Sequence, residues 1–164
     1  MDKSKIMLFI DNDIATNVKS YFTEKGYPTS LRPDAKSAYA ELREGGALRN
    51  IDVLIVHKDL GAISRDWSLT SDGVCEYVHE HYPWIRIGIV SGEFPDGTRH
   101  VEGMEADFYF SYIGLTSEWM KEQLDKGTKT QDEMKQHKLE ISPEGEGFVP
   151  WPEEEDHEGR LASL

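Results

Sequence analysis

The sequence predicts a doubly wound α/β domain, in which helices cover both faces of a parallel five-stranded sheet. Three observations lead to this prediction. Short apolar runs of strand length alternate with amphipathic segments of helical length from residue 6 to about residue 127. The runs at residues 6–10 and 53–56 are continuously apolar, as expected for strands buried on both faces. An acidic segment containing prolines and glycines follows, and we expect it to form a tail outside the domain.

Five segments have the length and composition of strands. Four are apolar runs, and the weak one lies beside Pro28 and Pro33, which suits the edge of a sheet. The five predicted strands are residues 6–10, 29–31, 53–56, 85–90 and 108–110.

Helices are predicted after each strand because the intervening segments begin with a capping side chain and carry apolar residues three or four positions apart. The capping candidates are Asp13, Asp34, Ser71 or Asp72, and Thr116 or Ser117. Glycines suited to end helices are Gly26, Gly45, Gly46 and Gly127. A further helix is expected in residues 94–105, where Pro95, Gly97 and Gly103 make it short or poorly formed.

Five strands that alternate with five helices fit the flavodoxin-like strand order 2-1-3-4-5. Sheets of this kind place their functional site at the carboxyl ends of the strands, where the strand order reverses. In this order the site lies at the ends of the first and third strands. The residues there are Asp11, Asn12, Asp13 and His57.

Composition narrows the class of partner. A net charge of −13 argues against a nucleic-acid or an anionic-membrane surface, because both need clustered Lys and Arg. No apolar run approaches the ~20 residues of a membrane span. Cys75 is the only cysteine, so neither an internal disulfide nor a thiolate zinc cluster can form. We expect a cytoplasmic protein with a domain at residues 1–127.

Residues 128–164 form the predicted tail, extended or disordered. Residues 140–164 carry eight acidic residues and one arginine, hence seven of the thirteen excess negative charges. Phe148 and Trp151 stand in a proline-containing stretch just before an acidic run, as in short linear recognition motifs. They either anchor a partner or fold back on the domain.

The chain resembles a response-regulator receiver domain of two-component signalling over residues 4–126. Five segments carry this resemblance in order, and each lies where the family keeps a landmark. They are residues 8–13 (LFIDND), 52–57 (DVLIVH), 71–73 (SDG), 89–92 (IVSG) and 105–113 (EADFYFSYI).

The resemblance implies a pocket that has lost its chemistry. In the family an aspartate accepts a phosphoryl group, an acidic pair holds magnesium, and a lysine contacts the phosphate. Here His57 is at the acceptor position, Asn12 replaces the second acid, and Tyr112 replaces the lysine. Three positions keep the family's residue type: Asp11 and the switch-like pair Ser91 and Tyr109. The degenerate pocket comprises Asp11, Asn12, Asp13, His57, Ser91 and Tyr112.

The leading interpretation is a non-enzymatic pseudo-receiver that acts through protein–protein interaction, without a cofactor. Its partner, or a second copy, would bind the surface of residues 94–105, 108–110 and 116–127, including Arg99, His100, Tyr109, Tyr112 and Trp119. One alternative is an atypical response regulator that is phosphorylated at Asp59 or His57. Another is a small metal-dependent hydrolase built from Asp11, Asp13 and His57, a set that would also be the candidate for weak magnesium binding.

Four further expectations concern single side chains. His57 is expected to fill the inactive pocket with its imidazole bonded to Asp11. The loop at residues 58–70 is longer than the family's, and we expect Trp67 to order it by being buried. Cys75 is expected to be a buried or half-buried thiol, and His79 and His81 to be surface residues.

Overall fold

The computed structural model describes residues 3–11, 13–60, 70–92, 94 and 106–134. Its centre is a parallel sheet with the strand order β2-β1-β3-β4-β5, as predicted. The strands are β1 (Ile6–Phe9), β2 (Thr29–Arg32), β3 (Val53–His57), β4 (Arg86–Val90) and β5 (Phe108–Phe110).

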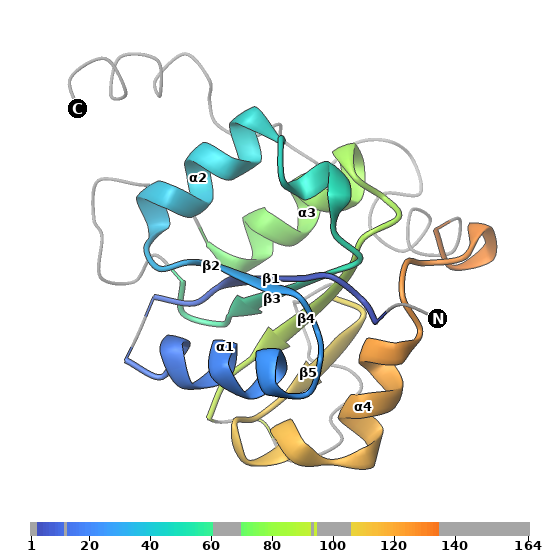
Figure 1. Ribbon diagram of the computed structural model, residues 1–164. Coiled ribbons are helices and arrows are strands. Elements are labelled where there is room, and N and C mark those ends of the chain that lie inside the picture. The colour runs from blue at the N-terminus through green and yellow to red at the C-terminus, as the bar shows by residue number, and fades with distance from the viewer. Residues whose placement is uncertain (1–2, 12, 61–69, 93, 95–105, 135–164) are drawn as a thin grey trace.

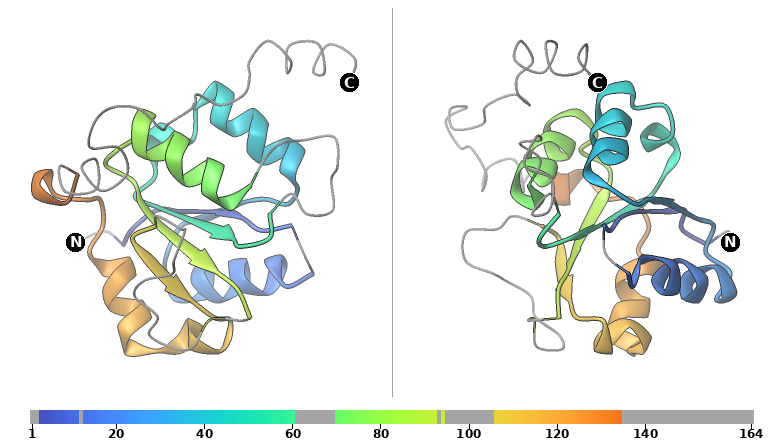
Figure 2. Two further views of the ribbon diagram at one scale, coloured as in Figure 1. Left: turned by 180° about the vertical axis from the view of Figure 1, so that it is seen from behind. Right: turned by 90° about the vertical axis from the view of Figure 1, so that its left-hand side faces the viewer.

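Helices cover both faces of the sheet, with α2 and α3 on one face and α1 and α4 on the other (Figures 1 and 2). The helices of the described residues are α1 (Ala15–Glu24), α2 (Ala35–Glu44), α3 (Ser71–His81) and α4 (Glu118–Asp125), with the 3₁₀ turns η1 (Leu48–Asn50) and η2 (Ile113–Thr116). The helix expected in residues 94–105 lies, apart from Phe94, outside the described residues.

The central strands are buried from end to end. Every residue of β1 and β4 is buried, as are the first four of β3, so only apolar side chains can fill most of these positions. Position 88 in β4 has room for no side chain at all, because a Cβ atom on Gly88 would overlap the ring of Phe108 in β5. The absence of a side chain at Gly88 therefore leaves room for the Phe108 ring to pack against β4.

Two of the predicted helix caps are confirmed. The Asp34 carboxylate accepts from the Ser37 amide at the start of α2, and the Ser117 hydroxyl accepts from the Met120 amide in α4. Gly45 ends α2 with φ of 68°, a left-handed conformation that glycine adopts without strain.

The cap predicted for α1 is wrong, whereas α3 begins at Ser71, one of the two residues expected to open it. α1 begins after Ile14, without a side-chain cap, because Asp13 lies in an exposed turn that precedes the helix. α3 is capped by Thr70, whose hydroxyl accepts from the Gly73 amide. Ser71 is already helical, and its hydroxyl donates to the Lys58 carbonyl oxygen at 2.8 Å.

His79 is buried, so the prediction that it lies at the surface is wrong. Its side chain is 4% exposed, and its Nε2 lies 3.7 Å from Oδ2 of Asp107, just before β5. Lys129 Nζ lies 3.4 Å from the same oxygen, with its side chain 1% exposed. His81 is exposed and Cys75 is buried, as expected. The chain after α4 thus covers this end of α3 and encloses three titratable groups.

The folded part of the chain continues past residue 127, where the sequence placed the domain boundary. Arg86, at the start of β4, is nearly buried and donates to the carbonyl oxygens of Gly127 and Thr128. Its two terminal nitrogens bond to the Glu133 carboxylate at 2.9 and 3.1 Å. The Lys129 amide donates to the Trp84 carbonyl oxygen at 2.8 Å. The packed domain therefore extends at least to residue 134.

This boundary predicts different results for two truncations. Ending the chain at residue 139 should change the free energy of unfolding by less than about 1 kcal/mol, because the Arg86 contacts remain. Ending it at Gly127 should cost at least about 2 kcal/mol, because a buried guanidinium loses its carboxylate. Urea denaturation of both forms measures the difference. Equal stabilities would show that Arg86 does not depend on the segment after α4.

Burial of His79 predicts a loss of stability in mild acid. Burial, together with the nearby Lys129 charge, lowers the pKa of His79 to about 4 from its ordinary value of 6.5, although Asp107 opposes the shift. The folded protein therefore keeps His79 neutral, whereas the unfolded chain takes up a proton below pH 6.5. The resulting stabilisation is complete above pH 6.5 and is lost as the pH falls toward 4.

By pH 5 the loss from this one group should reach about 2 kcal/mol. Urea denaturation at pH 7.5 and pH 5 measures it, with His79→Gln expected to flatten the dependence. His81→Gln, on the exposed side of the same helix, is the matched control and should behave as wild type. Burial tends to raise the pKa of Asp107, but His79, Lys129 and the Ile87 amide hold it well below its usual range, so Asp107 titrates only in stronger acid. An unchanged slope in His79→Gln would contradict the assignment.

Candidate functional site

The predicted site residues lie at the carboxyl edge of the sheet. Asp11 follows β1, His57 ends β3 and Ser91 follows β4. His57 pairs with Val90, and Val90 pairs with Phe110, so parallel strands bring these chain positions to one edge. The Ser91 amide donates to the Phe110 carbonyl oxygen at 3.0 Å, which continues the sheet bonding by one residue beyond β4.

The centre of the site is a contact between Asp11 and His57. Nδ1 of the imidazole lies 3.1 Å from Oδ1 of the carboxylate, and the side chains are 14% and 10% exposed. The expected bond between the His57 imidazole and Asp11 is therefore confirmed, and it engages one of the two carboxylate oxygens.

The residues present do not fit the magnesium ion that the resemblance implies. One oxygen of Asp11 is bonded to His57, Asp13 is exposed in the turn before α1, and Asn12 lies outside the described residues. Within the described ranges, no three His, Cys, Asp or Glu side chains lie close enough together to hold a metal ion. Asp11, Asp13 and His57 are therefore not assembled into the three-ligand group considered from the sequence.

Asp59 lies in the turn that follows His57. Its side chain is 53% exposed, and Lys58 Nζ lies 3.9 Å from its carboxylate. The Leu60 amide donates to the His57 carbonyl oxygen at 3.0 Å, which closes the turn. Lys58 also acts on Asp72, where partial burial raises the pKa of the carboxyl and the Lys58 charge opposes that rise. Asp59 is thus a solvated carboxylate at the rim of the site.

The two switch-like residues are packed inside the protein. Ser91 is 3% exposed and Tyr109 is 1% exposed. The Tyr109 hydroxyl accepts from the Ala106 amide at 2.9 Å, and its ring meets Phe94 edge-on with the centroids 5.7 Å apart. In this structure Tyr109 is therefore buried and does not lie on the surface where the sequence placed it.

The remaining predicted contact residues divide into two groups. Tyr112, at the lysine position, and Trp119 are partly buried and pack on the core between the sheet, α1 and α4. The second group lies outside the described residues. It comprises Arg99 and His100 of the predicted surface, Trp67 of the loop at residues 58–70, and Phe148 and Trp151 of the tail.

A search for membrane spans found no helix in the described ranges that is both long and apolar enough to cross a bilayer. No family model matches the sequence, and no curated protein matches it either.

Solved structures do match the fold. A response regulator receiver domain protein from Bacillus halodurans aligns with a TM-score of 0.54 at 18% identity, covering 74% of this chain and 95% of that chain. A response regulator receiver domain from Clostridium thermocellum gives 0.53 at 16% identity, covering 82% and 98%. The RcsB response regulator of Salmonella typhimurium, solved in a study of its DNA interaction, gives 0.53 at 14% identity, covering 99% and 78%.

At these identities the similarity is one of fold. The chain has the architecture of receiver domains, and the strand order agrees with it.

This site predicts weak magnesium binding. Magnesium prefers a set of oxygen ligands, and here an imidazole stands beside the Asp11 carboxylate. We expect a Kd of about 1 mM or weaker, equivalent to about −4 kcal/mol. Zinc or nickel, which accept imidazole nitrogen, should bind more tightly than magnesium if any metal binds. An NMR titration measures this, and tight, site-specific magnesium shifts around Asp11 would contradict it.

Proposed function

We propose that this protein is a pseudo-receiver, a non-enzymatic signalling module that acts by binding another protein independently of aspartyl phosphorylation. The observation that carries the proposal is the Asp11–His57 contact at the position of the phosphate-accepting aspartate. The receiver fold supplies the context, because that position has a defined role in proteins of this architecture.

Two further observations support the proposal. Transfer of a phosphoryl group to a carboxylate needs positive charge near the transferred group to stabilise its oxygens. Tyr112 carries a neutral phenol at the position where the family has a lysine, and it packs on the core. Tyr109 is already held inside by the Ala106 amide and Phe94. The lysine position therefore carries no positive charge, and the switch-like aromatic residue lies in a buried position.

A protein partner suits the charge of the chain better than a nucleic acid. The net charge is −13, and phosphate backbones are bound through clustered Lys and Arg. RcsB has the same fold and was solved in a study of its DNA interaction, but DNA interaction is a property of RcsB and is not transferred to this chain. For this chain we propose a partner with a basic surface, since charge complementarity speeds association and selects the partner.

The proposal predicts that the full chain takes up no phosphoryl group. After incubation with acetyl phosphate and magnesium, intact-mass measurement should show no phosphate adduct, because neither an acceptor carboxylate nor a lysine occupies its place. Beryllofluoride with magnesium should likewise give no bound ¹⁹F NMR signal. An active receiver domain treated in parallel shows that the reagents work.

The same measurement distinguishes the two alternative acceptors. Asp59 is accessible and stands beside Lys58, so it is the carboxylate at this rim best placed to compete. An adduct in wild type that disappears in Asp59→Asn would replace the proposal with an atypical response regulator. An acid-labile adduct that disappears in His57→Gln would assign phosphorylation to the imidazole. Either adduct would refute a phosphorylation-independent module.

A further inference from the structure

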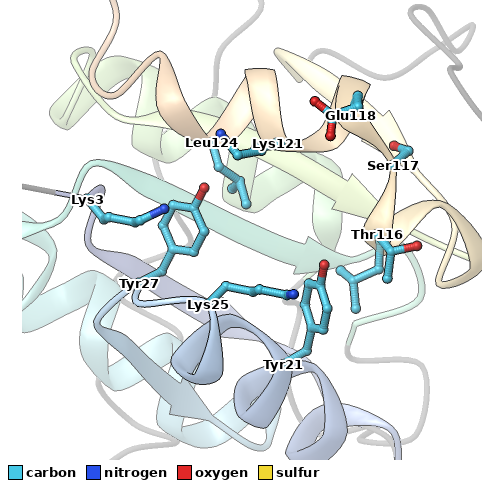
Figure 3. A pocket seen from close by; sticks show the side chains of 10 residues that line it. Lys3, Tyr21, Lys25, Tyr27, Thr116, Ser117, Glu118, Lys121 and Leu124 are labelled. Carbon is cyan, nitrogen blue, oxygen red and sulfur yellow. The ribbon is translucent and has the colours of Figure 1, made fainter.

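A pocket of about 280 Å³ lies between α1 and α4 (Figure 3). These two helices cover the sheet face opposite α2 and α3 (Figure 1). Its walls carry three lysines from different segments: Lys3 before β1, Lys25 at the end of α1, and Lys121 in α4. Tyr21 and Tyr27 supply aromatic walls. Such a gathering of lysines contrasts with the net charge of −13 of the whole chain.

The pocket holds its charged groups in defined positions. Lys3 Nζ lies 4.8 Å from the ring centroid of Tyr27, and Lys25 Nζ lies 5.5 Å from that of Tyr21. Figure 3 shows both amines lying beside the rings. The Tyr27 hydroxyl donates to Oδ1 of Asp125 at 2.7 Å, while Lys121 pairs with the other oxygen at 2.8 Å.

These contacts determine the charge that a ligand would meet. Burial and the bond to Asp125 raise the pKa of Tyr27, so its hydroxyl stays a neutral donor. Glu118 lines the pocket and Asp125 lies at its edge, so two carboxylates oppose three ammonium groups. The remaining positive charge, together with aromatic and aliphatic walls, suits an acidic peptide that also carries aromatic side chains.

We propose that this pocket binds the chain's own C-terminal segment, residues 140–164. This segment places Phe148 and Trp151 just before the acidic run at residues 153–156, which is the chemistry that the pocket complements. Docking would hold the two aromatic residues against the domain and away from a partner. The inference does not rest on the chemistry of His57, so it and the proposed function can fail separately.

The length of the chain beyond the described residues allows this occupant. After α4 the described chain turns to the amino edge of the sheet, where Lys129 and Glu133 contact Trp84 and Arg86, and it ends at residue 134. Sixteen residues lie between the last described residue, 134, and Trp151, and this stretch can span up to ~60 Å. A domain of this size has a radius of gyration of about 14 Å, so the pocket is within reach. A tethered segment also acts at an effective concentration in the millimolar range, so weak contacts are enough.

Paramagnetic NMR on the full chain tests the proposal. Cys75 is 0% exposed, so a nitroxide can be attached selectively to a cysteine introduced by Gly159→Cys, beside the acidic run. At low salt the label should broaden the amide signals of Lys25, Tyr27 and Lys121. The broadening should fall at least twofold in high salt, because screened charges attract less.

Two matched variants assign the contact to the pocket. Lys3→Glu with Lys25→Glu should reduce the broadening at least twofold. Lys19→Glu with Lys36→Glu makes the same charge change at exposed positions that do not line the pocket, and it should leave the broadening unchanged. Equal effects of the two pairs would overturn the proposal, as would broadening that is absent or spread over other faces.

A mixed sample identifies the source of the segment. Nitroxide-labelled chains without ¹⁵N are mixed with ¹⁵N chains that carry no nitroxide. In this mixture the amide signals of the pocket should stay sharp, because each pocket holds the segment of its own chain. If the broadening in the mixture is as strong as in ¹⁵N chains that carry their own nitroxide, the segment in the pocket comes from a second copy. This result would overturn docking within one chain.

Discussion

Burial of the central strands on both faces is the constraint on which the rest of the molecule depends. Side chains of β1, β3 and β4 have almost no access to solvent, so ionisable groups are confined largely to the strand ends. Asp11 and His57 occupy the carboxyl edge of the sheet, whereas Arg86 and Asp107 occupy the amino edge. Because a group at either edge is only partly solvated, it needs a polar partner, and both edges provide such partners.

The amino edge shows how this requirement determines where the domain ends. Arg86 starts a buried strand, and a guanidinium there must be satisfied by carbonyl or carboxylate oxygens. Gly127, Thr128 and Glu133 supply them, so the segment after α4 belongs to the domain. Lys129 then lies over Asp107 and helps to enclose His79. The composition of the segment after Gly127 did not indicate that it packs on the domain, because its charged residues are typical of a solvated tail.

Sequence reasoning succeeded where a local rule decides the outcome. Continuous apolar runs identified the strands, and Asp34 and Ser117 identified two helix starts, because strand burial and capping depend on neighbouring residues. It failed where tertiary packing decides. His79 follows Cys75 by one helical turn, so burial of that thiol was a signal that His79 shares the buried side of α3. Burial of Tyr109 depends in part on Phe94, which lies fifteen residues earlier, at the start of the β4–β5 connection.

The carboxyl edge pairs a carboxylate with an imidazole instead of with a second carboxylate. Carboxylates placed close together repel one another unless a cation neutralises them. The contact between His57 and Asp11 involves no such repulsion. The basic pocket between α1 and α4 contains neither Asp11 nor His57 in its lining, so a ligand bound there acts outside this pair.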